Sequence, residues 1–147
     1  MFLNDFVLKF EGMTVLTTVE VPFAWDDFYK KFAYLYYGIM AEAQATDADS
    51  MELMRKTVSR FWSRNAGQLP GFQGYTSNKV DSLFDWLYLN DTDAAYCKNE
   101  VFPFLKHHKE EIPEALLQFI SATAKEIAQL AGTANNAFLQ ELESCIQ

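Results

Sequence analysis

Apolar and polar residues alternate with a period of two over the first 21 positions of the chain, a spacing typical of β-strands. The alternating apolar positions are Phe2, Phe6, Leu8 and Phe10, and then Met13, Val15, Val19 and Val21. A two-residue turn at Glu11 and Gly12 would pair Phe10 with Met13 and would place both sets on one side of a ribbon. We therefore predict a two-stranded β-hairpin over residues 1–21. Such a ribbon is marginal alone, so we expect it to pack on the helices or to pair with another chain.

From Pro22 onward the apolar positions follow the helical period of 3.6 residues. The predicted helices cover about 23–44, 50–64, 79–90, 113–132 and 134–146. A further helical stretch, 92–108, contains Pro103, which we expect to kink or split it because proline cannot donate the helical hydrogen bond. The predicted fold class is mainly α: a compact bundle of about five or six helices with an N-terminal two-stranded β-hairpin. A length of 147 residues fits a single domain over 1–147, with the helical part at 23–147.

Two helix starts carry capping residues in the sequence. We expect Asp49 to cap the helix at 50–64, with Glu52 three residues later as an acidic variant of the capping box. Ser77 or Asn78 is expected to cap the helix at 79–90.

Composition narrows the class of protein. The chain is 50% hydrophobic and 16% aromatic, which argues against intrinsic disorder. Its net charge of −8 argues against direct nucleic-acid binding, whose footprint is basic. No stretch is apolar for long enough to span a membrane, and the first residues lack a basic signal-peptide region, so a cytoplasmic location is expected. Cys97 and Cys145 are expected to be buried free thiols rather than a disulfide framework.

The sequence contains no nucleophile elbow, phosphate loop or metalloprotease motif. His107 and His108 are the only histidines, and adjacent helical residues point about 100° apart, so they are poorly placed to hold one metal ion. We expect these two residues to lie at a solvated helix end. The prediction is that the protein is not an enzyme and uses neither a metal nor a cofactor.

Two groups of aromatic residues are candidates for contact with a partner. Phe72 and Tyr75 lie in a glycine-rich stretch, 65–78, that we predict to be a long loop; the alternative is that both rings pack on the core. Tyr34 and Tyr37 fall outside the apolar stripe of the first helix and would suit an interface, unless this helix is covered on both sides.

Four acidic residues complete the candidate binding set: Asp81, Asp85, Asp91 and Asp93. They contrast with the predicted helix at 50–64, which carries four basic residues. One interpretation is ion pairing within the molecule. The other is a dipolar surface whose acidic part meets a basic partner, which would raise association rate and specificity.

These features favour a small acidic protein-binding module of the inhibitor or immunity type, which covers a basic surface or active site of a toxin or nucleic-acid-handling enzyme. One alternative is an antagonist of a host defence complex, of the kind a mobile element encodes. Another is a homodimeric structural or assembly protein that pairs through the hairpin edge. A third is a small-ligand binder with an apolar pocket between helices.

Overall fold

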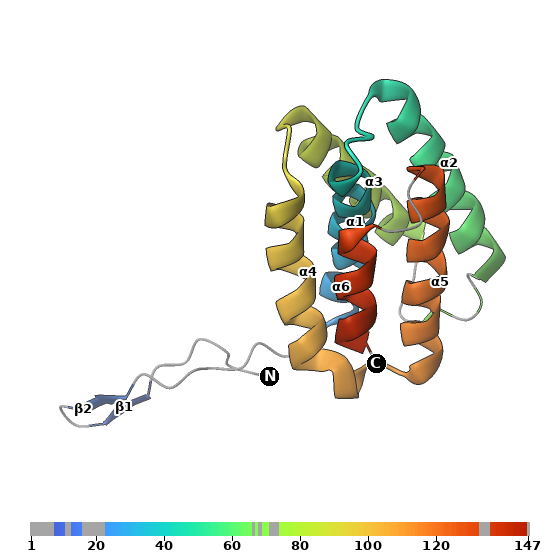
Figure 1. The fold of residues 1–147 in the computed structure, drawn as a ribbon. Coiled ribbons are helices and arrows are strands. Elements are labelled where there is room, and N and C mark those ends of the chain that lie inside the picture. Colours follow the sequence, from blue (N-terminus) through green and yellow to red (C-terminus); the bar gives the residue numbers. More distant parts are fainter. Residues whose placement is uncertain are drawn as a thin grey trace.

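A computed structural model describes residues 8–10, 13–15, 23–65, 67, 69, 70, 74–132 and 136–146. The described chain is mainly helical, as predicted, and its helices pack side by side (Figure 1). The six α-helices are α1 (Trp25–Glu42), α2 (Ala48–Asn65), α3 (Gly74–Leu89), α4 (Ala94–His108), α5 (Glu114–Leu130) and α6 (Ala137–Ile146). A short 3-10 helix, η2 (Lys109–Glu111), joins α4 to α5.

Two short strands, β1 (Leu8–Phe10) and β2 (Met13–Val15), are paired antiparallel, with Leu8 opposite Val15 and Phe10 opposite Met13. The other residues of the predicted hairpin, 1–7, 11–12 and 16–21, lie outside the described residues. A hairpin over 1–21 therefore stays a prediction.

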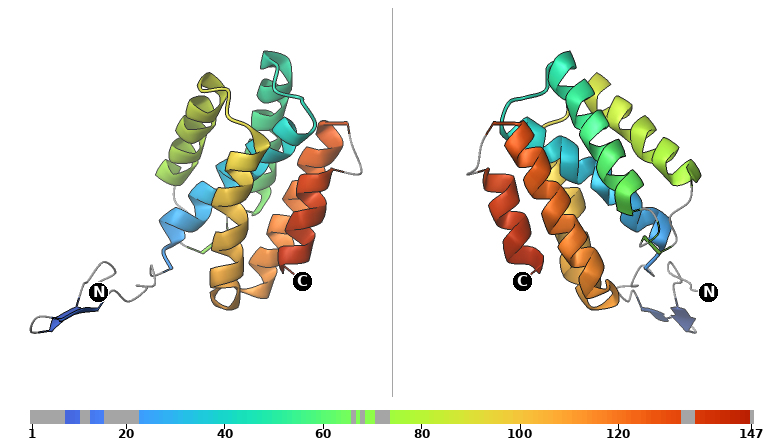
Figure 2. Two further views of the ribbon diagram at one scale, coloured as in Figure 1. Left: turned by 60° about the vertical axis from the view of Figure 1, so that its left-hand side comes forward. Right: turned by 90° about the vertical axis from the view of Figure 1, so that its right-hand side faces the viewer.

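Helix α1 lies at the centre of the bundle. It contacts α3, α4, α5 and α6, and it crosses the interior obliquely (Figure 2). Residues on all sides of α1 are consequently buried, including Phe28, Tyr36, Tyr37 and Gly38. Tyr37 has 1% of its surface exposed, so the prediction that it faces a partner is wrong. The physical reason is the alternative considered above: the helix is covered on both sides.

The core is built mainly from aromatic rings that pack on α1. Phe32 packs edge-on against Trp62 of α2 and stacks on Phe119 of α5, with ring centroids 5.4 and 5.8 Å apart. The Trp62 indole N–H donates a hydrogen bond of 3.0 Å to the Tyr36 hydroxyl, so that both buried polar groups have a partner. Burial raises the pKa of Tyr36 well above the ordinary tyrosine value. This ring is therefore a neutral core residue.

Several helix ends differ from those predicted. The α2 cap is Asp47 rather than Asp49: its carboxylate accepts hydrogen bonds from the backbone N–H and the hydroxyl of Ser50. Helix α3 begins at Gly74, so Ser77 and Asn78 lie inside the helix instead of capping it. The stretch between α2 and α3 is accordingly only 66–73, shorter than the predicted loop.

Helix α4 runs unbroken through Pro103, so the helix is not split there, and a kink at this residue stays a prediction. The Pro103 ring faces solvent, whereas Phe102 and Leu105 on either side of it are buried in the core. One lost backbone hydrogen bond on the solvent side is therefore offset by core packing along the same helix.

Gly38 of α1 lies where α4 and α6 pack closely against this helix. A Cβ atom at this position would lie 2.7 Å from Cζ of Phe138 on α6 and 2.9 Å from Cβ of Cys97 on α4. Both distances are far below van der Waals contact, so only a residue without a side chain fits between these helices.

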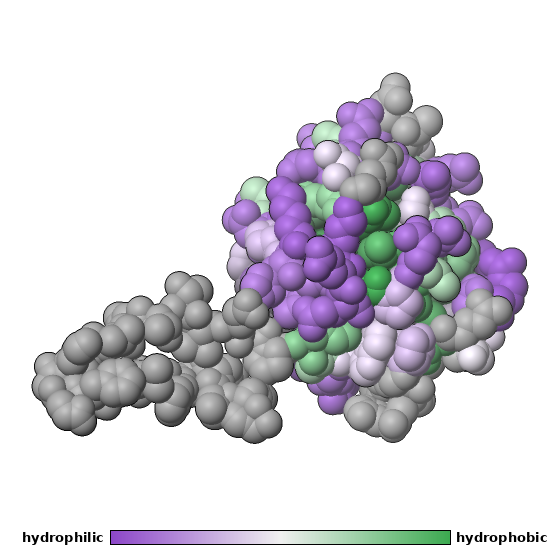
Figure 3. Space-filling view, turned by 90° about the horizontal axis from the view of Figure 1, so that it is seen from below, coloured by the Kyte–Doolittle hydropathy of each residue, from purple (hydrophilic) through white to green (hydrophobic). Residues whose placement is uncertain are grey.

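The described part of the face shown in Figure 3 is mostly hydrophilic. Seen from below, hydrophobic residues of the described part are visible chiefly as a narrow strip between hydrophilic ones (Figure 3). Among the described residues, no helix combines the length and the apolar character needed to cross a lipid bilayer.

Candidate functional site

Asp81 and Asp85, two of the four predicted acidic contacts, lie beside a cation of their own chain. Arg55 of α2 pairs with Asp85 and lies 3.9 Å from a carboxylate oxygen of Asp81. Burial raises the pKa of Asp81, an effect that Arg55 opposes and the neighbouring Asp85 reinforces. Both carboxylates therefore fit the interpretation of ion pairing within the molecule, and less of their charge is available to a partner.

Asp91 and Asp93 lie in the turn between α3 and α4, and both are exposed. The Asp93 carboxylate caps α4 by accepting a 2.9 Å hydrogen bond from the Tyr96 backbone N–H. Asp91 has a positive φ of 49°, a conformation that Asp and Asn tolerate better than most residues. Within the described residues, neither carboxylate is in a salt bridge.

Large apolar side chains are exposed beside these two carboxylates. Trp86 is 48% exposed, Leu89 79% and Tyr96 44%. The Trp86 and Tyr96 rings lie 6.5 Å apart, so they form one cluster at the junction of α3 and α4. We call the surface formed by Trp86, Leu89, Asp91, Asp93 and Tyr96 the acidic corner.

The sequence analysis missed Trp86, Leu89 and Tyr96. A signal was present, because α3 carries apolar residues around most of its circumference: Val80, Phe84 and Leu87 are buried, whereas Trp86 and Leu89 face outward. A surface helix usually has one apolar face, which packs on the core, whereas α3 has two. The second apolar face is exposed to solvent, and this exposure indicates a binding surface.

Tyr34 connects the acidic corner to a groove between α1 and α3. Its ring is partly buried and lies 6.2 Å from the Tyr96 ring. Burial and the nearby Glu100 raise the pKa of Tyr34, so its hydroxyl stays protonated. The groove is open, has a volume of about 720 Å³, and is lined by Lys30, Tyr34, Asn78, Lys79, Ser82, Leu83 and Trp86. Leu83 is only partly buried because it forms one wall of this groove.

The end of the groove remote from the acidic corner is basic. Lys79 and Lys30 lie 3.1 and 3.5 Å from the carboxylate of Asp26. Hydrogen bonding to Lys79 and attraction to both lysines lower the pKa of Asp26. The groove consequently runs from two lysines, past apolar side chains, to the carboxylates of the acidic corner.

The structure places the remaining predicted contacts only in part. Phe72 lies outside the described residues, and Tyr75 belongs to the first turn of α3 by its backbone. Pro70 is tied to α1, because the Tyr29 hydroxyl donates a hydrogen bond to the Pro70 carbonyl. Whether residues 72 and 75 contact a partner stays a prediction.

The two histidines differ in environment, contrary to the prediction of a solvated pair. His107 is exposed, but His108 is buried and lies against the rings of Phe23 and Phe104. Its Nδ1 atom is 2.7 Å from a carboxylate oxygen of Glu111. The reason is that His108 lies on the buried face of α4, at helical spacing from the buried Val101 and Leu105. In the described part of the chain, no group of three or more acidic, histidine or cysteine side chains is arranged to hold a metal ion.

The cysteines are buried free thiols, as predicted. Burial raises the pKa of Cys97 to about 12, which keeps this thiol protonated at neutral pH. Neither its protonation state nor its burial suits a nucleophile.

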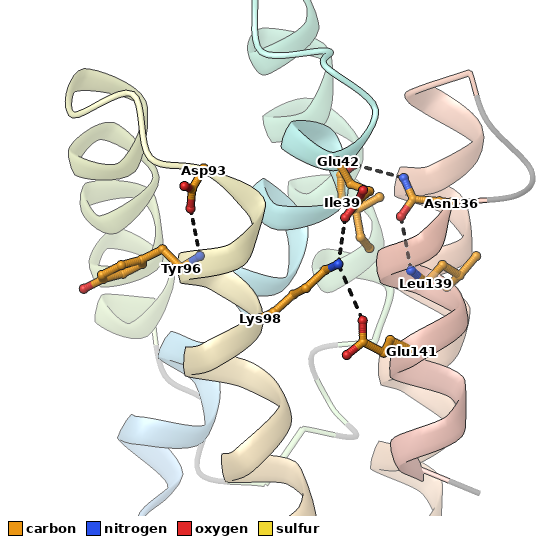
Figure 4. Close-up of polar contacts among 8 residues, drawn as sticks. All are labelled: Ile39, Glu42, Asp93, Tyr96, Lys98, Asn136, Leu139 and Glu141. Carbon is orange, nitrogen blue, oxygen red and sulfur yellow. Dashed lines mark hydrogen bonds and ion pairs between the residues drawn. The ribbon is translucent and has the colours of Figure 1, made fainter.

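Polar contacts hold α6 onto the two helices beside it (Figure 4). Lys98 of α4 lies 3.0 Å from a carboxylate oxygen of Glu42 on α1 and 3.5 Å from one of Glu141 on α6. Asn136 accepts a hydrogen bond from the Leu139 N–H, which caps α6, and donates another to the Ile39 carbonyl. These contacts have structural roles and lie apart from the groove residues.

The chain was also compared with known proteins. A scan against protein-family models, a search of curated proteins and a search of solved structures found no match.

Proposed function

We propose that the protein is a small binding module of the inhibitor or immunity type, and that its acidic corner docks on a basic surface of a protein partner. The observation that carries the proposal is the exposure of Trp86, Leu89 and Tyr96 beside the carboxylates of Asp91 and Asp93. Large aromatic side chains supply most of the energy at protein interfaces. Acidic residues next to them select a basic partner and speed its approach.

The structure adds three supporting features. The net charge of −8 acts over the whole molecule and attracts a basic target. The acidic corner rests on two helices, and Asp93 itself caps α4, so its residues are held in place before binding. The Cys97 thiol is buried and stays protonated, so it does not serve as an exposed nucleophile, which fits a binding function.

The expected partner presents a basic surface, such as the active site of a toxin or of an enzyme that handles nucleic acid. Such enzymes bind phosphates with lysine and arginine side chains, and a carboxylate-rich surface can occupy the same groove. A host defence complex that presents a comparable surface would be bound through the same contacts.

The test compares capture by the wild type and by matched variants. The immobilised chain is incubated with an extract of its source cell at low salt, and bound proteins are identified by mass spectrometry. We expect a basic protein that is lost with Trp86→Ala and with the double variant Asp91→Asn and Asp93→Asn. Asparagine is chosen because it caps helices and tolerates a positive φ, so only the charges are removed. Leu53→Ala is the control, since Leu53 is 49% exposed on another helix.

A second measurement tests inhibition itself. The captured protein is purified and its activity is titrated with the wild-type chain, which we expect to abolish it at about one chain per active site. Equal capture by the wild type and by both corner variants would refute the proposed surface. Undiminished activity of the saturated complex would refute the inhibitor function.

A further inference from the structure

The outward face of α3 carries a sequence pattern that is symmetric about Trp86. Its residues recur every three or four positions, the spacing of one helix face. They are Lys79, Ser82, Leu83, Trp86, Leu89 and Asn90. Ser82 and Asn90 lie four residues before and after Trp86, and both are small or polar. Leu83 and Leu89 lie three residues before and after it, and both are aliphatic.

The charges continue the symmetry with opposite signs. Lys79 precedes Trp86 by seven residues, a rise of about 10 Å along the helix axis. Asp93 follows Trp86 by seven residues, in the turn into α4. Each has a neighbour of its own sign, because Lys30 lies beside the same carboxylate as Lys79, and Asp91 shares the turn with Asp93. The face therefore runs from basic through apolar to acidic.

We propose that two copies of the chain associate through this face, with their α3 helices antiparallel across a two-fold axis at Trp86. A two-fold interface uses the same patch on both subunits, so the patch must complement itself when turned around. The α3 face meets that condition at each position. Positions equally far before and after Trp86 then lie level with each other: Leu83 with Leu89, Ser82 with Asn90, and Lys79 with Asp93 of the second copy. The two tryptophans pack on each other at the axis.

The apolar side chains beside α3 enlarge the contact. Tyr96 lies next to Trp86, and Tyr34 lies next to Tyr96. The exposed parts of Trp86, Leu89 and Tyr96 amount to a patch on the order of 300 Å² per copy, which is smaller than the ~800 Å² per partner of a stable interface. The dimer is consequently weak and depends on protein concentration.

This inference goes beyond the proposed function and does not require it. The two share Trp86, Leu89, Tyr96 and Asp93, so the second copy and a basic partner compete for one surface. It also differs from a dimer paired through the hairpin edge, because every residue it uses lies in the helical part of the chain.

The test measures mass by sedimentation velocity on the full chain, from about 1 µM to about 1 mM, a range that spans weak to moderate affinities. We expect the wild type to shift from monomer to dimer within it. Lys79→Glu and Asp93→Lys should each weaken the dimer about tenfold, because each brings like charges together at both ends. An equimolar mixture of these two variants should form a heterodimer about as strong as the wild-type dimer, since opposite charges then meet at both ends.

Two further variants separate this surface from general effects on folding. Trp86→Ala should abolish the dimer, and Leu53→Ala should leave it intact. Far-UV circular dichroism checks each fold, and Lys79→Gln with Asp93→Asn gives a neutral pair if a reversed charge unfolds the chain.

A wild type that stays monomeric at ~1 mM would overturn the inference, as would a dimer unaffected by Trp86→Ala or a mixture that fails to reassociate. None of these results bears on capture of a basic partner, and failure of that capture leaves the dimer measurement unaffected.

Discussion

Gly38→Ala should destabilise the protein, although alanine is normally the better helix residue. In an exposed helix this exchange stabilises by about 1 kcal/mol. Here the new methyl group would lie 2.7 Å from Cζ of Phe138, closer still to its Cε2, and 2.9 Å from Cβ of Cys97. The Phe138 ring cannot swing away freely, because it is fully buried and lies 5.0 Å from the Phe102 ring.

The expected magnitude follows from these two opposing effects. Adding a methyl group to a close-packed core costs typically 1–3 kcal/mol, and more where the neighbours cannot move. With the upper end of that range set against ~1 kcal/mol of helix propensity, the free energy of unfolding should fall by about 2 kcal/mol. For a chain of this length the melting temperature should fall by about 6 °C.

Urea denaturation followed by circular dichroism measures this change. Gly67→Ala is the matched control, because among the described residues no atom outside the adjacent part of the chain lies within 4 Å of a Cβ built at Gly67, and the exchange should be neutral or slightly stabilising. Trimming the opposing ring in the double variant Gly38→Ala with Phe138→Leu should cost less than the two single changes added together. A Gly38→Ala protein as stable as the wild type would refute the close packing of α1 against α6.

Three other predictions concern individual side chains. Asn136→Ala should lower the free energy of unfolding by about 2 kcal/mol, since it removes a helix cap and the hydrogen bond to the Ile39 carbonyl; an unchanged urea midpoint would contradict this. The ion pairs of Lys98 raise its folded pKa, so its stabilisation is complete below the ordinary lysine pKa and disappears as pH rises through the folded value. The stability difference between the wild type and Lys98→Met should therefore shrink as the pH rises above the ordinary lysine pKa of about 10.4. Cys97, whose pKa burial raises to about 12, should react with a thiol reagent near pH 8 only on unfolding, so that labelling accelerates with urea; rapid labelling of the native protein would show an open path to it.

The fold class and most helix positions could be predicted from the sequence, because the spacing of apolar residues reflects which side of each helix is buried. On α2 the apolar residues at helical spacing, Met51, Met54, Val58 and Trp62, are buried, and Phe61 beside them is partly buried. Local signals were less reliable at the helix ends. Gly74 reads as a loop residue but begins α3, and Pro103 reads as a helix break but lies on the solvent side of α4, where packing of its neighbours outweighs one lost hydrogen bond.

The candidate site was less predictable, because exposure depends on which helices are neighbours. Tyr37 is polar at one end and off the main stripe, yet it is buried because α1 is covered on both sides. Asp85 reads as a free surface charge, but the packing of α2 beside α3 brings Arg55 to it. Trp86 is a large apolar residue, but it lies on the outer face of α3 because Val80, Phe84 and Leu87 fill the inner face. The relative placement of helices distant in sequence decides each case.

The central position of α1 also determines when the protein can fold during synthesis. Asn136, which caps α6, donates its hydrogen bond to the carbonyl of Ile39, 97 residues earlier in the chain. On the ribosome, α1 is synthesised before α6, the last of the helices that cover it. Until α6 is made, the apolar side chains of α1 on that side are open to other nascent chains, a state prone to aggregation. A chain truncated before α6 should therefore need a chaperone to stay soluble, and a chain that includes α6 should not.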